Sequence, residues 1–271
     1  MRRNVSTSGR LLAGACAFLL GGMGASGTAL AHLVVTTRAD VLPIHVDVAQ
    51  PHSATYPGTG YKLGAAAALE IEWTISGTEY DGSPSPLTWI KVYTPAGTRM
   101  HPQGFPTCPE ALLAADGPEA CPRGSLAGAP GEGVGVVTFG DTRVPETVAV
   151  EPFFRPGGLF WYVRGQTPAA FELISKGTVV PNPQPGFAEL ATGEVPLVES
   201  VPGGLFASIE RLKLTVGAAF MRDGKLISYG TLPNSCPKGG FTGKTELSFL
   251  NGETISTAMT LACPKPKAGS R

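Results

Sequence analysis

Segments in which apolar and polar residues alternate recur along the chain, and they predict β-strands. The clearest lies at residues 69–75, where an apolar residue stands at every second position. Because successive side chains of a strand point to opposite faces, one face of this segment should be buried and the other wet. We expect further strands over residues 33–37, 42–49, 87–94, 134–139, 146–154, 159–164, 205–220 and 225–232.

Two local patterns predict how the chain turns. Residues 245–250 and 253–261 flank Asn251-Gly252, a pair that tolerates positive φ and favours a type I′ hairpin turn. Residues 110–115 favour a short helix, which Gly117-Pro118 would end.

Composition supports a β-rich fold. The chain has 36 Gly and 25 Pro, which interrupt long helices, while 42% hydrophobic residues are too many for a disordered chain. We therefore predict a mainly β protein, an immunoglobulin-like or jelly-roll-like β-sandwich spanning residues 32–263. It would form one or two small domains, with a subdivision near residues 95–130 left open. Residues 264–271 read as a flexible polar tail.

The N-terminal residues 1–31 have the pattern of a secretory signal peptide. Arg2, Arg3 and Arg10 precede an apolar stretch over residues 11–23, which is short for a membrane span. Ala29-Leu30-Ala31 then supplies the small-x-small pattern that signal peptidase cleaves. We predict cleavage after Ala31 and a secreted, extracellular protein; an uncleaved membrane anchor is the alternative.

Removal of the signal changes the charge balance. Three of the 21 basic residues lie in it, so 18 remain against 21 acidic residues, a net charge of about −3. A mildly acidic chain argues against nucleic acid as a partner. No second apolar run approaches the length of a membrane helix, so we expect no stable membrane insertion after processing.

Four cysteines lie outside the signal, and each is followed by proline: Cys108, Cys121, Cys236 and Cys263. An even number in an oxidising compartment predicts two disulfides, with three possible connectivities. Proximity in sequence favours Cys108–Cys121 and Cys236–Cys263. A cysteine metal site is the competing interpretation, but no Cys-x-x-Cys pair is present.

Two cysteine-containing segments resemble a motif of uncharacterised secreted proteins from high-GC Gram-positive bacteria. The first runs from Phe105-Pro106-Thr107-Cys108 through Gly117-Pro118 to Cys121-Pro122-Arg123-Gly124-Ser125, an FPxC…GPxxCPxGS pattern. The second is the C-terminal hairpin that begins Cys236-Pro237-Lys238-Gly239-Gly240-Phe241. The resemblance implies export and disulfides, and it implies no activity.

Motifs of the common enzyme classes are incomplete. The stretch at residues 124–128 has a serine one place too early for a Gly-x-Ser-x-Gly elbow, and the glycines at 131–135 lack the lysine of a phosphate loop. Glu70 and Glu72 share one strand face, as solvated residues commonly do. We therefore favour a noncatalytic secreted protein of unknown ligand, acting at the cell envelope or outside it. A cell-surface polymer or a protein would be its partner, and Tyr56, Tyr61, Tyr80 and Trp89 are candidates for stacking on sugars.

Copper binding is the alternative function. Cleavage after Ala31 would give His32 a free α-amine beside its imidazole, and a second imidazole would complete a copper-binding histidine brace. His45, His52 or His101 could supply it, and His45 and Asp47, two apart in the predicted strand 42–49, would place two ligands on one strand face. This arrangement is similar to that of lytic polysaccharide monooxygenases and related exported copper carriers. No other cofactor is expected.

Overall fold

The computed structural model describes residues 32–264 apart from residues 51, 59, 169 and 183. The signal predicted over residues 1–31 lies outside this range, as do residues 265–271 of the predicted tail. The described residues belong to one compact unit. No helix in this part of the chain is long and apolar enough to cross a membrane.

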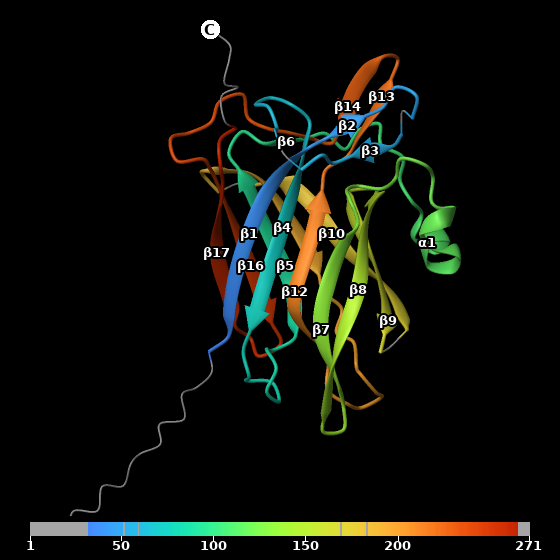
Figure 1. Cartoon of the computed structure of the whole chain (residues 1–271), viewed down its shortest axis with the longest axis vertical. Coiled ribbons are helices and arrows are strands. Elements are labelled where there is room, and N and C mark those ends of the chain that lie inside the picture. Colours follow the sequence, from blue (N-terminus) through green and yellow to red (C-terminus); the bar gives the residue numbers. More distant parts are fainter. Residues whose placement is uncertain (1–31, 51, 59, 169, 183, 265–271) are drawn as a thin grey trace, which may run out of the picture. The chain divides into compact units, whose positions relative to one another are not determined.

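One large sheet of eleven strands dominates the described residues, and every neighbouring pair in it is antiparallel (Figure 1). In spatial order its strands are β1 (Val34–Pro43), β4 (Ala67–Ser76), β12 (Ser208–Val216), β7 (Gly131–Phe139), β8 (Thr142–Arg155), β9 (Gly158–Thr167), β10 (Phe171–Pro181), β11 (Phe187–Glu194), β5 (Leu87–Pro95), β16 (Phe241–Phe249) and β17 (Thr254–Leu261).

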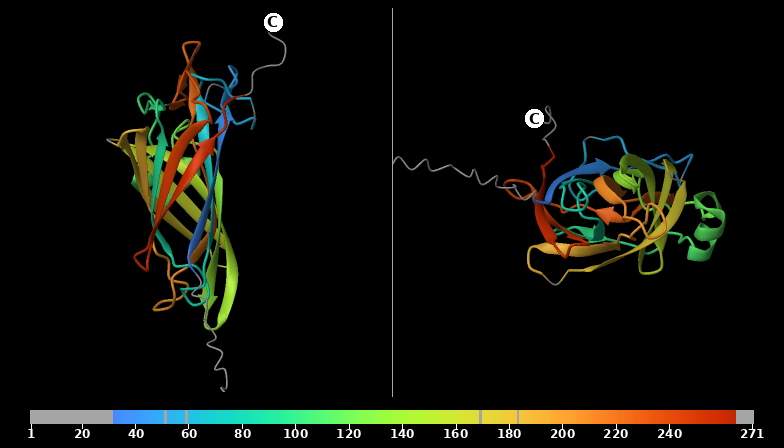
Figure 2. Two further views of the ribbon diagram at one scale, coloured as in Figure 1. Left: turned by 90° about the vertical axis from the view of Figure 1, so that its left-hand side faces the viewer. Right: turned by 90° about the horizontal axis from the view of Figure 1, so that it is seen from below.

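The sheet is rolled, so that its strands surround a common interior and its two edges meet (Figure 2). A threonine network joins these edges. Thr37 of β1 shares hydrogen bonds with Thr257 of β17 and Thr245 of β16. Trp73 of β4 donates its Nε1 proton to Thr245 Oγ1 across the interior at 3.2 Å. The two halves of the sheet therefore face each other as the layers of a sandwich do.

The mainly β class and the two disulfides predicted from the sequence are confirmed. The layers belong to one continuous hydrogen-bonded sheet, whereas an immunoglobulin-like sandwich has two separate sheets. Rolling a single sheet brings strands that are distant in sequence, such as β1 and β17, to the same seam.

Strand β4 follows the alternation that the sequence predicts. Trp73 and Ile75 are almost completely buried in the main core cluster, which draws residues from both halves of the sheet. On the outer face, Glu70 pairs with Lys213 at 3.1 Å and Glu72 with Arg211 at 3.3 Å. The two glutamates are thus part of a half-exposed row of ion pairs between β4 and β12.

The prediction of one continuous strand over residues 42–49 is wrong. Strand β1 continues to Pro43, and only β2 (His45–Val46) follows it, paired with β3 (Ala54–Thr55). The chain then turns, because Asp47 Oδ1 accepts a hydrogen bond from the Ala49 N–H at 2.9 Å. Val48 is consequently 77% exposed.

The C-terminal hairpin is confirmed, but its turn is not type I′. Type I′ requires positive φ at both central residues, and only Gly252 has it, with φ 88°. The Gly252 N–H donates to the Phe249 carbonyl, so a turn around Leu250-Asn251 precedes the glycine. The predicted short helix is confirmed as α1 (Glu110–Asp116).

Short elements gather at the end of the sheet drawn uppermost in Figure 1, which we call the upper end. They are the hairpin β13 (Ala219–Arg222) and β14 (Lys225–Ser228), the pair β6 (Arg99–Met100) and β15 (Gly230–Thr231), and the pair β2 and β3. Helix α1, which the 3-10 helix η1 (Pro118–Ala120) follows, lies at the side of the sheet, where its Leu113 packs against residues of β8 and β9. The opposite, lower end carries the turns of the β7–β8 and β16–β17 hairpins and the segment 195–207 between β11 and β12.

Candidate functional site: an apolar cavity inside the rolled sheet

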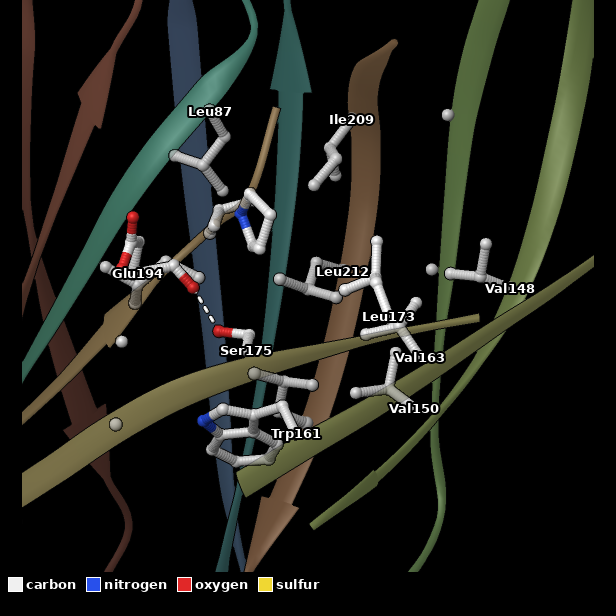
Figure 3. Close-up of a pocket in the computed structure, with 18 of the residues that line it drawn as sticks. Leu87, Val148, Val150, Trp161, Val163, Leu173, Ser175, Glu194, Ile209 and Leu212 are labelled. Atoms are coloured by element: carbon white, nitrogen blue, oxygen red, sulfur yellow. Dashed lines mark hydrogen bonds between the residues drawn. The ribbon is translucent and has the colours of Figure 1, made fainter. Parts of the chain in front are cut away.

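An internal cavity of about 430 Å³ lies between the two halves of the sheet. Its walls are the inward faces of strands from both halves, and Figure 3 shows apolar side chains converging on it. Residues that line it include Leu87, Val148, Val150, Val163, Leu173 and Leu212. The apolar residues on the inward faces of the strands therefore line a cavity in this part of the molecule.

Glycines on the inward faces explain why the interior is hollow. Gly133 and Gly135 of β7, Gly177 of β10 and Gly193 of β11 all line the cavity, where a packed core would carry larger side chains. Gly177 and Gly193 are paired partners across β10 and β11. The indole of Trp161 lies over this glycine pair and forms part of the cavity wall.

The size and lining of the cavity suit an organic molecule. Small-molecule sites commonly measure about 300–1,000 Å³ and are mostly apolar. A single water takes about 30 Å³ in the liquid and needs two or more polar partners to be held in a protein interior. Walls made mainly of valine, leucine and isoleucine offer water few such partners, so they favour an apolar occupant.

A few polar groups interrupt the apolar lining. The Ser175 hydroxyl donates to the backbone carbonyl of Glu194, as the dashed line in Figure 3 shows. Glu146 is only 4% exposed, and its Oε1 accepts a hydrogen bond from the Thr167 N–H at 3.2 Å. Both side chains are therefore held by the protein itself.

Aromatic side chains form a cluster beside the cavity, and Tyr229 of this cluster lines it. Phe154 packs against Phe105 and Tyr229, with ring centroids 4.7 and 4.9 Å apart, and Phe220 meets the edge of Phe105 at 5.0 Å. Burial raises the pKa of Tyr229 to about 12, with a smaller contribution from Glu189. The phenol is consequently neutral at physiological pH, so it presents an uncharged surface to the cavity.

The segment 195–207 covers the lower end. Ser200 Oγ accepts a hydrogen bond from the Thr138 N–H at 3.1 Å, and the Tyr80 hydroxyl accepts one from the Phe206 N–H at 3.1 Å. Val198 and Glu199 of this segment line the cavity. One irregular segment held by side-chain hydrogen bonds thus forms the cavity wall at the lower end.

Both disulfides have the pairing favoured by sequence proximity. Cys108 and Cys121 bracket α1 and η1, with Cα atoms 5.2 Å apart, and Cys108 is completely buried beside Leu113 and Phe153. Cys236 and Cys263, with Cα atoms 5.8 Å apart, join the segment before β16 to the end of β17. Neither bridge lines the cavity.

The residues of the predicted copper site are not brought together. His32 precedes β1, whereas His45 and Asp47 follow it, and ten residues of extended chain span about 30 Å. His52 stacks on Phe220 at the upper end, and the His101 N–H donates to the Tyr229 carbonyl there. Among the described residues no group of three or more His, Cys, Asp or Glu is placed to hold a metal ion.

The four aromatic residues considered for sugar stacking have separate surroundings. The Tyr56 hydroxyl donates to the Gly217 carbonyl at 2.8 Å, and the Tyr61 hydroxyl donates to the Ala262 carbonyl. Tyr80 anchors the segment 195–207, and Trp89 is 37% exposed on the outer face of β5. Three of the four thus support neighbouring backbone, and no common aromatic surface follows from their positions.

The sequence pattern predicts no strand at β10 or β11, which form part of the cavity wall. The signal that points to them is the small residues themselves. Ser175 and Gly177 occupy inward positions of β10, and Ala191 and Gly193 do so in β11. Small residues at alternate positions are what strands that face a cavity require.

Comparisons with known proteins add no relative: no protein-family description, curated protein or solved structure matches this chain.

Proposed function

We propose that this protein is an exported, noncatalytic binding protein that holds a small apolar molecule inside its rolled sheet. The observation that carries the proposal is the cavity of about 430 Å³ with apolar walls. Burying apolar surface contributes about 25 cal/mol per Å², so an apolar molecule gains more from this site than water does.

The disulfides support the exported location. Disulfides form and persist in oxidising compartments such as the extracellular space and the bacterial periplasm. Both bridges staple loops that a reducing environment would leave unconstrained. An apolar molecule is poorly soluble in the water outside the cell, which gives a carrier with an internal cavity a clear role there.

The polar groups of the cavity support binding rather than catalysis. A serine nucleophile needs a nearby base to accept its proton. The Ser175 hydroxyl instead donates to a backbone carbonyl, and Glu146 accepts a backbone N–H. The proposal therefore assigns these groups to the wall and assigns no reaction to the site.

A fluorescent probe tests the proposal with two variants at neighbouring positions of β9. N-phenylnaphthylamine is neutral and apolar, and its emission rises in a dry environment. Val163 lines the cavity, whereas Arg164 points outward and is exposed. Val163→Phe places an aromatic ring in the cavity, and Arg164→Phe places the same ring on the opposite face of the same strand.

We expect saturable one-site binding of the probe to the natural protein. Val163→Phe should weaken binding about tenfold or more, because the added ring occupies ligand volume, while Arg164→Phe should change it by less than about twofold. Absence of saturable binding, or equal loss in both variants, would overturn the proposal. Circular dichroism of both variants establishes that they are folded.

A further inference from the structure

Two tryptophans point into the rolled sheet, and they differ in their hydrogen bonds. Trp73 is 1% exposed, and its indole N–H donates to Thr245 Oγ1 at 3.2 Å. Trp161 lines the cavity (Figure 3), and within the part of the chain that the structure describes its indole N–H has no acceptor. The fold therefore supplies a partner for one indole donor and leaves the other available to a ligand.

Space for an acceptor lies directly beside this free N–H. Gly193 of β11 is an inward position, and a Cβ atom placed on it would meet one atom within 4 Å beyond its own chain neighbours, the Trp161 Nε1 at 3.7 Å. The corresponding position on Gly177 is filled, because the Thr192 carbonyl oxygen lies 2.6 Å away. A ligand atom can thus approach the indole nitrogen from the side of Gly193.

The rest of the lining favours a neutral acceptor. Among the described residues that line the cavity, none is lysine, arginine or histidine. A carboxylate ligand would lose its hydration in this apolar site without a cation to offset the cost. A carbonyl oxygen carries no net charge and accepts a hydrogen bond, and an indole N–H is a donor only, so it suits an acceptor.

We propose that the ligand is a neutral apolar molecule with a carbonyl oxygen, such as a ketone or an ester, and that this oxygen accepts the Trp161 N–H beside Gly193. This inference rests on the proposed binding function and adds the chemical class of the ligand and its point of attachment. The apolar remainder of the ligand contacts the aliphatic lining, which includes Val163 and Leu173.

Two probes of the same shape isolate the hydrogen bond. Methyl nonyl ketone carries a carbonyl oxygen, and its methylene analogue carries a CH2 group in place of that oxygen. Each is used to displace N-phenylnaphthylamine from the protein, and the ratio of the two dissociation constants measures the contribution of the oxygen. Because both probes lose similar apolar contacts when a wall residue changes, the ratio responds chiefly to the hydrogen bond.

Two phenylalanine variants locate the donor. Trp161→Phe removes the indole N–H, so it should reduce the ratio in favour of the ketone about fivefold, the effect of one net hydrogen bond. Tyr229→Phe is the matched control, because Tyr229 also lines the cavity and carries a donor hydroxyl. This variant should leave the ratio within about twofold of that of the natural protein.

Nuclear magnetic resonance of the natural protein labelled with nitrogen-15 observes the donor itself. The chain has three tryptophans, so the spectrum contains three indole N–H signals. The Trp161 signal is assigned by its loss in Trp161→Phe or, if that variant does not fold, by its contacts with Gly177 and Gly193. We expect the ketone to move this proton signal downfield and the methylene analogue to leave it without that shift. The Trp73 signal should stay in place with both probes.

Each outcome decides a separate statement. If both probes bind but the ketone gives no downfield shift at Trp161, the hydrogen bond is wrong, although the binding function stands. A ratio that falls in Tyr229→Phe and not in Trp161→Phe would overturn the attachment point. If neither N-phenylnaphthylamine nor either probe binds, the proposed function itself fails.

Discussion

The indole nitrogen of Trp161 lies 3.2 Å from the point that a Cβ atom on Gly177 would occupy. The tryptophan ring therefore depends on a glycine in the neighbouring strand, and together they shape one wall of the cavity. The same Cβ atom would lie 2.6 Å from the Thr192 carbonyl oxygen on β11, a contact that side chains do not tolerate. The cavity wall is consequently specified by backbone as well as by side chains.

Substituting this glycine should disturb the wall. We expect Gly177→Ala to lower the free energy of unfolding by about 1–3 kcal/mol, because the new methyl group overpacks the wall, and to shift the tryptophan emission maximum. Gly193→Ala is the matched control, since its Cβ would meet Trp161 at an ordinary 3.7 Å, and its effect should stay below about 1 kcal/mol. Urea unfolding measures both; similar costs for the two variants would contradict the account.

The threonine network at the seam should contribute to stability through its hydroxyl groups. Thr245 is completely buried and accepts the Trp73 Nε1 proton. Thr245→Val preserves the shape but leaves that N–H without its acceptor, which should cost about 1–3 kcal/mol. Thr245→Ser keeps the hydroxyl and loses one methyl group, at about 0.8 kcal/mol. Chemical denaturation of the two variants distinguishes them, and a valine variant as stable as the natural protein would refute a role for the network.

The two disulfides should differ modestly in their contributions. The bridges join residues separated by 13 and 27 positions. Loop-closure entropy then predicts about 3 kcal/mol for Cys108–Cys121 and somewhat more, about 3–4 kcal/mol, for Cys236–Cys263. Paired Cys→Ser variants, unfolded in urea, measure each contribution. If removing a bridge leaves the unfolding midpoint unchanged, that loop is held by packing alone.

Glu246 should make stability depend on pH on the acid side. The hydrogen bond from Lys244, at 2.7 Å, lowers the pKa of Glu246; burial opposes this, and the hydroxyl of Tyr93 assists it. The unfolded chain therefore binds the proton more readily. The stabilisation is complete above the ordinary glutamate pKa of about 4.3 and is lost as pH falls through the lowered pKa of the folded state.

Two variants isolate this dependence on pH. Glu246→Gln should make the free energy of unfolding fall less steeply between about pH 5 and pH 3 than in the natural protein. Lys244→Met removes the donor and should flatten the same part of the curve. Unfolding measured across this range provides the test, and curves parallel to that of the natural protein would show that the ion pair contributes nothing.

Sequence patterns predict the cavity strands whose inward positions carry large apolar residues, and they do not predict β10 and β11, whose inward positions include small residues. Strand β4 alternates large apolar and charged residues, because its inner face packs around Trp73 and its outer face carries ion pairs. Strand β10 has Ser175 and Gly177 at inward positions, so the apolar period is interrupted where the interior is hollow. A pattern of alternating large apolar residues therefore does not indicate this strand.

The seam depends on pairings that span most of the chain. Thr37 contacts Thr257, and Trp73 contacts Thr245, and no local spacing indicates either contact. His32 and His45 lie at opposite ends of the continuous strand β1, and copper binding stays a prediction. The disulfide pairing, by contrast, is local, and proximity in sequence was sufficient to predict it.

The most direct test of the account is a crystal structure of the protein soaked with bromine-labelled dodecanol, with the bromine located by its anomalous scattering. The account predicts an anomalous peak inside the rolled sheet, among Val150, Trp161 and Leu212. Saturating the crystal with no peak in the interior, or finding the cavity filled by rearranged side chains, would contradict the claim that this protein binds an apolar molecule there.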